Sequence, residues 1–269
     1  MNIVPPLKLE LVVFDMAGTT VQDDDAVHRC LCAALVGAGL VVTRDEVNEV
    51  MGMPKPVAIG LLLERRKYHG DSAPPAEVAA IHESFLQRMI AFYRTDPAVR
   101  EIDGASEILG QLRRAGLKLA LDTGFSRDIV DAILQRLGWA GKDLLDATVA
   151  SNEVPRGRPH ADLVFRAMEL TGVTEARCVA KVGDTPSDLQ EGRAAGCGLV
   201  IGVTNGSHTR AQLEPHPHTH LIDNLRELPE LLLGHRHEKT QLNHGPVLRS
   251  SGEPKATPYL PPTATAEGG

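Results

Sequence analysis

Short apolar runs alternate with longer amphipathic stretches along most of the chain. The runs lie at 11–14, 118–121, 147–150, 178–182 and 199–203, with a shorter one at 221–222. Continuous apolar runs of this length are typical of strands buried on both faces of a parallel sheet. Between the runs, apolar residues recur at helical spacing at 105–115, 127–137, 160–170, 189–195 and 225–233. The alternation predicts an α/β fold with a doubly wound, Rossmann-like parallel sheet.

The segment that follows the first run interrupts this alternation, because it contains helical patterns and no strand pattern. Helical spacing is seen at 26–38, 44–51, 57–68 and 76–93. Thr43 precedes the second of these as an N-cap, and Pro74-Pro75 separates the last two. We therefore expect an inserted all-helical cap domain at 23–96 and an α/β core domain formed by 1–22 and 97–234.

The last part of the chain, 235–269, is rich in His, Pro, Thr and Gly and has no periodicity. This composition predicts a disordered C-terminal tail. Seven of the eleven histidines follow residue 200, at His208, His216, His218, His220, His235, His237 and His244. Metal binding by this scatter is the alternative interpretation, which we favour less than a solvated tail.

Composition limits the partners and the location of the protein. Aromatic residues make up 3% of the chain and the formal net charge is −7, which argues against a nucleic-acid partner. No apolar run approaches the roughly 18 residues that span a membrane, and no signal segment is seen, so we expect a cytoplasmic protein with no membrane association. The pattern leaves open a homodimer through a cap helix such as 26–38.

The four cysteines lack both zinc-ligand spacing and disulfide density. We expect them to be reduced and buried, with a redox pair at the first two as a much less favoured alternative. They are Cys30, Cys32, Cys178 and Cys197.

Polar residues that could take part in catalysis or binding follow four of the predicted strands. Asp15 ends the first strand, Thr123 follows the second, Arg158 lies in the loop after the third, and Asp184 and Asp188 follow the fourth. The carboxyl ends of parallel strands meet at one edge of a sheet, which is where such folds bind ligands. We therefore predict a single site at this edge. Taken alone, Asp15 is also compatible with a helix cap.

The run Asp15-Met16-Ala17-Gly18-Thr19 after an apolar strand resembles the first motif of the haloacid dehalogenase (HAD) superfamily. The resemblance covers roughly 9–233 and implies that Asp15 is a nucleophile toward phosphorus. It further implies that Thr123 binds phosphate, that Arg158 takes the place of the usual Lys, and that the Gly183-Asp184-x-x-x-Asp188 motif binds metal. The residues implied to contact substrate are Ala17, Gly18, Thr19, Met51, Gly52 and Gly124.

Electrostatics and the resemblance together predict Mg²⁺ as the cofactor. Asp15 and Asp184 would repel each other and an incoming phosphonate dianion unless a hard cation lay between them, and Mg²⁺ prefers carboxylates, waters and substrate oxygens. We assign Asp15, the carbonyl of Ala17 and Asp184 as ligands, with Asp188 acting through water. A helix N-cap is the alternative role for Asp188, and it could serve both.

Ala17 stands where most superfamily phosphatases have a second Asp. That Asp protonates a departing alkoxide, which contributes about 10²–10⁴ in rate. The Ala form resembles phosphonoacetaldehyde hydrolase (phosphonatase) and the phosphonatase-like hydrolases, which break a carbon–phosphorus bond. An imine formed by a lysine can accept the electrons of that bond.

Lys55, within Met51-Gly52-Met53-Pro54-Lys55, resembles the lysine that forms this Schiff base in phosphonatases. Amine attack requires a partly neutral lysine, and burial under a closed cap favours the neutral form. The alternative is a surface lysine at a helix start. Two positions differ from the phosphonatase pattern, with Ala58 in place of His and Phe125 in place of Tyr. These differences leave the identity of the substrate undecided.

The leading hypothesis is a Mg²⁺-dependent hydrolase of the C–P bond of a small 2-oxoalkylphosphonate, acting through an aspartyl-phosphate and a lysine Schiff base. The nearest alternative is a HAD-type phosphatase of small phosphate monoesters, similar to phosphoglycolate phosphatases. A catalytically weak protein that senses a phosphorylated metabolite is the third. The substituent on the substrate and the oligomeric state lie beyond what the sequence indicates.

Overall fold

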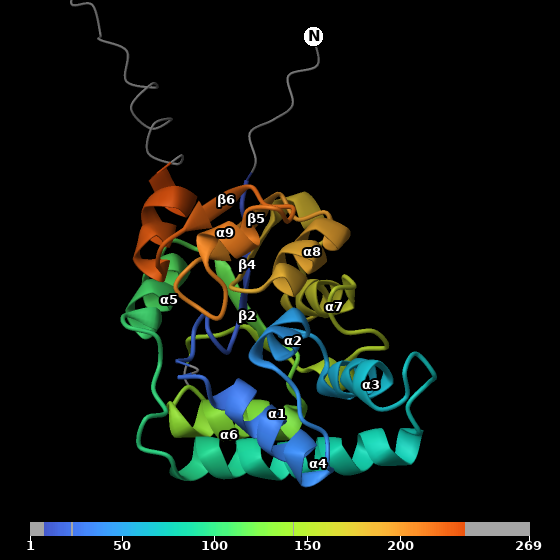
Figure 1. Ribbon diagram of the computed structural model, residues 1–269. Helices are drawn as coiled ribbons and strands as arrows, with labels where there is room; N and C mark the ends of the chain where they lie inside the picture. The colour runs from blue at the N-terminus through green and yellow to red at the C-terminus, as the bar shows by residue number, and fades with distance from the viewer. Residues whose placement is uncertain (1–7, 23, 142, 235–269) are drawn as a thin grey trace, which may run out of the picture. The chain divides into compact units, whose positions relative to one another are not determined.

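A six-stranded parallel sheet forms the centre of the fold in the computed structural model, which describes residues 8–22, 24–141 and 143–234 (Figure 1). The strand order is β3-β2-β1-β4-β5-β6, with every neighbouring pair parallel. The predicted doubly wound α/β sheet is therefore confirmed. The strands are β1 Leu11–Asp15, β2 Lys118–Asp122, β3 Ala147–Val149, β4 Val179–Gly183, β5 Leu199–Val203 and β6 His220–Ile222.

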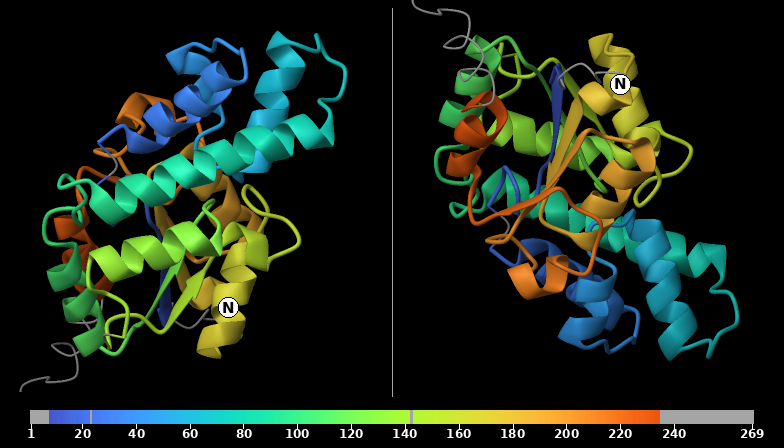
Figure 2. Two further views of the ribbon diagram at one scale, coloured as in Figure 1. Left: turned by 90° about the horizontal axis from the view of Figure 1, so that it is seen from below. Right: turned by 90° about the horizontal axis from the view of Figure 1, so that it is seen from above.

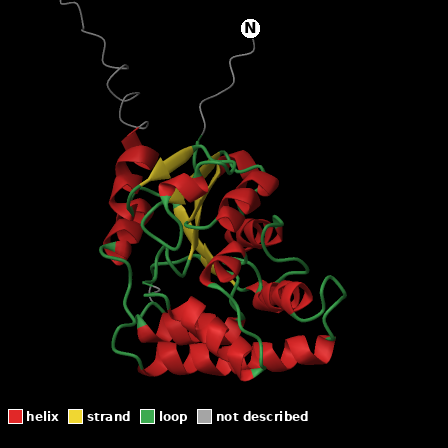
Figure 3. Cartoon of the chain, in the orientation of Figure 1, coloured by secondary structure: helices red, strands yellow, loops and turns green. Residues whose placement is uncertain are grey.

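Helices cover both faces of this sheet (Figure 3). Alternate residues of β1 pack into different clusters, Val12 and Phe14 into one and Leu11 and Val13 into the other. The second cluster is completed by α7, Asp162–Thr171, and the same face is covered by α8, Pro186–Ala195. The first is completed by α5, Ala105–Arg114, by α6, Arg127–Arg136, and by helical residues 228–234. Burial on both faces explains why β1 has no polar positions before Asp15.

A helical insert lies between β1 and β2, as predicted. Its first four helices are α1 Ala26–Gly37, α2 Arg44–Glu49, α3 Lys55–Arg66 and α4 Pro75–Thr95. The long helix α4 packs against α1, α3 and α6 (Figure 2). The expected cap at Thr43 is present, because its side chain accepts from the Glu46 amide at 3.3 Å while Glu46 accepts from the Thr43 amide at 2.8 Å.

Several boundaries differ from the sequence prediction. Helix α3 begins at Lys55 rather than at residue 57, because Pro56 occupies the first turn, where a missing N–H leaves no hydrogen bond unmade. Helix α9, Arg210–Leu213, and the 3₁₀ turns η1 Ser151–Glu153, η2 Ala176–Cys178 and η3 Leu225–Glu227 were not expected as such.

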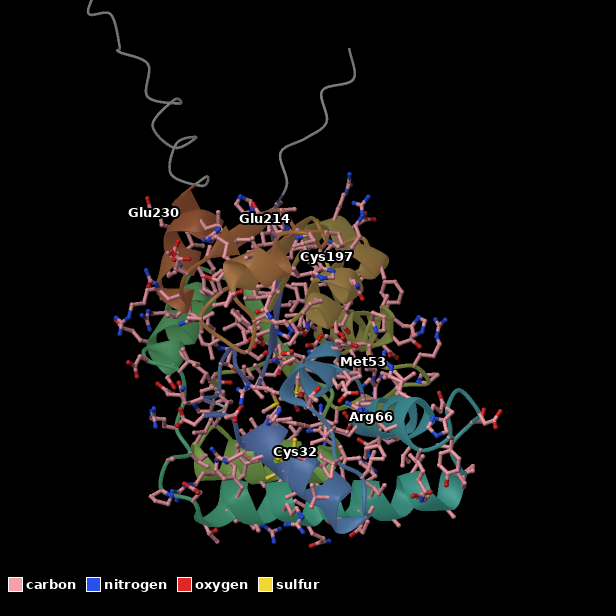
Figure 4. All side chains as sticks on the ribbon, in the orientation of Figure 1. Cys32, Met53, Arg66, Cys197, Glu214 and Glu230 are labelled. Carbon is pink, nitrogen blue, oxygen red and sulfur yellow. The ribbon has the colours of Figure 1, made fainter. Side chains whose placement is uncertain are left out.

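The cysteines are only partly buried, which corrects the expectation of full burial. No disulfide joins them, and the two labelled in Figure 4 lie on separate elements, Cys32 on α1 and Cys197 just after α8. The tail predicted at 235–269 lies outside the described residues. Within the described part, no helix is long and apolar enough to cross a membrane.

Candidate active site

The predicted site residues meet at the carboxyl edge of β1, β2 and β4. Asp15 ends β1, Thr123 follows β2, and both line one small cavity together with Arg158 and the cap residue Lys55. The cavity volume is about 30 Å³, room for about one or two water molecules. Its full lining is Asp15, Ala17, Val27, Met51, Gly52, Lys55, Thr123, Gly124, Phe125, Arg158, Thr185 and Ser207.

Three buried carboxylates converge beside the cavity. Asp15, Asp184 and Asp188 each offer an oxygen, and these oxygens lie within 4.8 Å of one another. Burial raises the pKa of Asp15 well above its usual value despite the nearby Arg158 guanidinium. Burial, followed by repulsion from Asp188, raises the pKa of Asp184 to about 6. Crowded carboxylates of this kind are a donor set that fits a hard divalent cation such as Mg²⁺.

Asp184 is held in place by hydrogen bonds from two loops. The amide and the hydroxyl of Ser207 each donate to Oδ2 at 2.6 Å, and Thr19 Oγ1 donates to Oδ1 at 3.1 Å. Gly18 has φ +87°, and a Cβ there would lie 2.3 Å from Asp184 Oδ2, so only glycine fits. Neither Gly18 nor Thr19, both predicted to bind substrate, lines the cavity; both contact Asp184. Sequence reasoning did not assign Ser207.

Asp188 belongs to the capping box of α8. The N-cap is Thr185, whose hydroxyl donates to Asp188 Oδ2 at 2.5 Å and accepts from the Asp188 amide at 3.3 Å. Asp188 is therefore the third residue of the helix rather than its N-cap. Its other oxygen, Oδ1, lies 3.0 Å from Arg158 Nη1. A capping role and a place in the carboxylate cluster are thus combined in one side chain.

Arg158 is buried at the centre of the site, with 3% of its surface exposed. Nη1 donates to Asp15 Oδ1 at 2.6 Å and Nε donates to Glu191 Oε2 at 2.9 Å. Nη2 donates to the carbonyl of Asp122 at 3.1 Å and also to its carboxylate. Nη1 thus faces the carboxylates of Asp15 and Asp188, whereas Nε and Nη2 are paired with Glu191 and Asp122.

Lys181, Asp122 and Glu191 complete this buried network and were not predicted as site residues. Lys181 Nζ lies 2.9 Å from Glu191 Oε2 and also contacts the Asp122 carboxylate. All three side chains are 0% exposed. A signal was present in the sequence: Lys181 interrupts the apolar run of β4, and a charge in a buried strand has to be paired.

Lys55 is the first residue of α3 and is buried, with 3% of its surface exposed. Nζ donates to the carbonyl of Met53, a loop residue labelled in Figure 4, at 3.3 Å. It lies 6.0 Å and 5.9 Å from the ring centroids of Phe85 and Phe125. The surface-lysine interpretation is therefore wrong. The partial positive charge at the N-terminus of α3 opposes an ammonium at this position.

The loop 51–54 carries Lys55 over the cavity and packs tightly on the core. A Cβ on Gly52 would lie 2.5 Å from Thr185 Oγ1, and Gly52 has φ +80°. A Cβ on Gly157 would lie 2.3 Å from Pro54 Cγ. The loop is therefore in close contact with the core at Gly52 and, through Pro54, at Gly157.

Comparisons with known proteins agree with this geometry. The family model described as haloacid dehalogenase-like hydrolase matches residues 12–202. The chain is 30% identical over 225 residues to a phosphonoacetaldehyde hydrolase of Bacillus cereus (strain B4264), covering 77% of this chain and 82% of that one. It is also 30% identical over 227 residues to the phosphonoacetaldehyde hydrolase of Bacillus mycoides (strain KBAB4), with coverage of 77% and 82%.

A solved structure has the same fold. The crystal structure of a phosphonoacetaldehyde hydrolase-like protein from Oleispira antarctica superposes with a TM-score of 0.75 at 20% identity, covering 87% of this chain and 94% of that one. With this fold, the family match and the site at the sheet edge, the chain belongs to the haloacid dehalogenase-like hydrolases, and the curated relatives that it resembles are phosphonoacetaldehyde hydrolases.

Proposed function

We propose that this protein is a Mg²⁺-dependent hydrolase that cleaves the C–P bond of a small 2-oxoalkylphosphonate such as phosphonoacetaldehyde. The observation that carries the proposal is that a buried amine, Lys55, and a buried carboxylate, Asp15, line the same cavity. A buried amine beside the nucleophile can form an imine with a carbonyl substrate, and the imine can accept the electrons of the C–P bond. The names of the curated relatives support the same substrate class.

In the proposed reaction the amine of Lys55 adds to the carbonyl of the substrate and water leaves, which gives an iminium. Asp15 then attacks phosphorus, the C–P bond breaks, and its electron pair moves to the iminium to give an enamine on Lys55. Water hydrolyses the aspartyl-phosphate, and the enamine is protonated and hydrolysed to the aldehyde or ketone. Arg158 and Thr123 bind the phosphoryl oxygens.

Asp15, Asp184, Asp188 and the carbonyl of Ala17 would hold the metal ion. When bound, Mg²⁺ supplies positive charge that lowers the repulsion between the carboxylates and the phosphonate. Ala17 lines the cavity where a phosphatase would need an acid. This fits a leaving group that departs as an enamine and does not need to be protonated on oxygen.

The two departures from the phosphonatase pattern support a substrate with an apolar substituent. Phe125 lines the cavity 5.9 Å from Lys55 Nζ and brings a phenyl ring in place of a polar side chain, and Ala58 is fully buried in α3, which begins at Lys55. We assign 23–96, which contains helices α1 to α4, to a cap that brings Lys55 to a core formed by 1–22 and 97–234.

The test is phosphate release with Mg²⁺ from phosphonoacetaldehyde and from a panel of phosphate monoesters, for the wild type, Lys55→Arg and Lys67→Arg. Lys67 is an exposed cap lysine paired with Glu77 and is the matched control. We expect release from the phosphonate to be lost only in Lys55→Arg. Borohydride should trap substrate on the wild type and leave Lys55→Arg unmodified, as read by mass spectrometry.

Phosphonate turnover that survives Lys55→Arg would refute the proposal. Release from monoesters that is independent of Lys55, with no release from phosphonates, would make the protein a phosphatase. Ligand binding without any turnover would favour a sensor of phosphorylated metabolites.

A further inference from the structure

Strand register places two unexpected charged residues beside the nucleophile. Asp122 lies opposite Asp15 in the pairing of β2 with β1, and Lys181 lies opposite Val13 in the pairing of β4 with β1. Side chains two residues apart on a strand point to the same face. Asp15, Asp122 and Lys181 therefore project from one face of the sheet, the face covered by α8, which supplies Glu191.

The three nitrogens of the Arg158 guanidinium contact two groups of residues. Nη1 lies 2.6 Å from Asp15 Oδ1 and 3.0 Å from Asp188 Oδ1, so it faces the carboxylates beside which the phosphoryl group would bind, and that group would replace one of these contacts. Nε and Nη2 are occupied by Glu191 and by Asp122, which accepts through both its carbonyl and its carboxylate. Because the guanidinium is planar and rigid, fixing two of its nitrogens fixes the direction of the third.

Lys181 allows the two acceptors to lie close together. Its ammonium contacts the Asp122 carboxylate and lies 2.9 Å from Glu191 Oε2, so one cation bridges two buried carboxyl groups. Burial raises the pKa of Glu191 to about 8. Oε2 can accept hydrogen bonds from Lys181 and Arg158 whether or not Oε1 carries a proton, so the arrangement does not depend on ionisation of Glu191.

We propose that Asp122, Glu191 and Lys181 are positioning residues that aim the guanidinium of Arg158 at the phosphoryl group bound next to Asp15. None of the three lines the cavity, so each acts through Arg158. The inference rests on the proposed function only in assigning phosphoryl binding to Arg158, and it is independent of Lys55. Displacement of a catalytic group by 1 Å costs about 10²-fold, so losses of about 10- to 100-fold are expected.

The test measures how tightly inorganic phosphate binds in the presence of Mg²⁺, by calorimetry. Asp122→Asn and Glu191→Gln are each made in the wild type and in an Arg158→Lys background. We expect each substitution to weaken phosphate binding at least about tenfold in the wild type and less than about twofold in the Arg158→Lys background. Lysine has no planar guanidinium whose direction Asp122 and Glu191 could fix. Equal losses in both backgrounds, or unchanged affinity in the wild type, would overturn the proposal.

Thermal unfolding of the same variants shows whether weaker phosphate binding results from a loss of stability. Glu153→Gln is the control, because it removes another Arg–Glu contact, Arg127 Nη2 to Glu153 at 2.6 Å, outside the cavity lining. We expect it to leave phosphate affinity unchanged. If Glu191→Gln does not fold, Asp122→Asn provides the test, since it keeps both the volume and the carbonyl contact. Phosphate binding is measured on protein that keeps Lys55, so failure of the Schiff-base proposal, which is tested by turnover of the phosphonate, would be recognised separately.

Discussion

At the scale of single residues, Ala17 is the position beside the nucleophile at which the proposed function needs no acid. It lines the cavity close to Asp15 and brings no functional group to it. The adjoining residues have structural tasks, because Thr20 Oγ1 donates to the Asp15 carbonyl at 2.9 Å and Thr19 donates to Asp184. Position 17 is therefore where an acid could be added with the least disturbance.

Ala17→Asp should convert the site toward ester hydrolysis. A carboxylic acid at this position can protonate an alkoxide leaving group, a contribution of about 10²–10⁴ in general acid catalysis. We expect phosphate release from monoesters to rise at least about tenfold, with loss of phosphonate turnover. Steady-state kinetics of Ala17→Asp beside Ala17→Asn, which has the same size and no acid, provide the check. Equal rates for the two variants would contradict the proposed role of Ala17.

Sequence analysis found the cavity residues that lie at motif positions. It missed the charged residues that strand register brings next to them. Asp15, Thr123 and Arg158 follow strands, and the structure brings them together at one cavity. The pairing of Lys181 with Asp122 joins neither sequence neighbours nor neighbouring strands, and only the strand order brings them together. A lone charge in an apolar run predicts that a partner exists without naming it.

At the scale of elements, the loop 51–54 and the start of α3 determine where Lys55 lies in the site. The loop brings Lys55 to the cavity and packs against Thr185 at the start of α8. The helix begins at Lys55 because prolines at 54 and 56 set its first turn. Helical periodicity alone placed the start later, because the apolar spacing begins only beyond this turn.

Gly52→Ala should reduce activity by displacing loop 51–54, which leads into Lys55, from its contact with Thr185. The added Cβ would meet Thr185 Oγ1 at 2.5 Å. Gly39→Ala is the matched control, since Gly39 has φ +79°, close to the +80° of Gly52, but nothing lies within 4 Å of its Cβ position. Both variants carry the left-handed backbone cost of about 1–2 kcal/mol.

We expect kcat/KM to fall at least about tenfold for Gly52→Ala and to stay near wild type for Gly39→Ala, with similar losses of stability in denaturant. A parallel loss of activity in both variants would mean that backbone strain, rather than contact with Thr185, is responsible.

At the scale of the whole molecule, the carboxylate cluster connects distant parts of the chain. Asp15 ends β1, Asp184 follows β4, and Asp188 lies on α8. The three carboxylates lie close together only in the folded chain, so the binding energy of an ion that contacts all three adds to the free energy of unfolding. The parallel sheet and the meeting of these carboxylates at one edge could be anticipated from the sequence, whereas the strand order β3-β2-β1-β4-β5-β6 could not.

Mg²⁺ should therefore stabilise the protein against heat. At a concentration about 100 times its Kd, a ligand adds about 2.7 kcal/mol, which corresponds to a rise in Tm of about 5–10 °C for a chain of this size. Asp184→Asn should abolish the rise, and Asp223→Asn, at an exposed position paired with Arg210, should retain it. Scanning calorimetry with Mg²⁺ and with EDTA makes the comparison. An unchanged rise in Asp184→Asn would exclude this cluster as the metal site.

For the proposed reaction, the small volume of the cavity bears on which molecule attacks the aspartyl-phosphate. The space beside Asp15 has room for about one or two water molecules, so in this arrangement of loop 51–54 water fits next to the nucleophile and an alcohol or a sugar does not. Under the proposal, hydrolysis rather than transfer to another metabolite would then be selected by size.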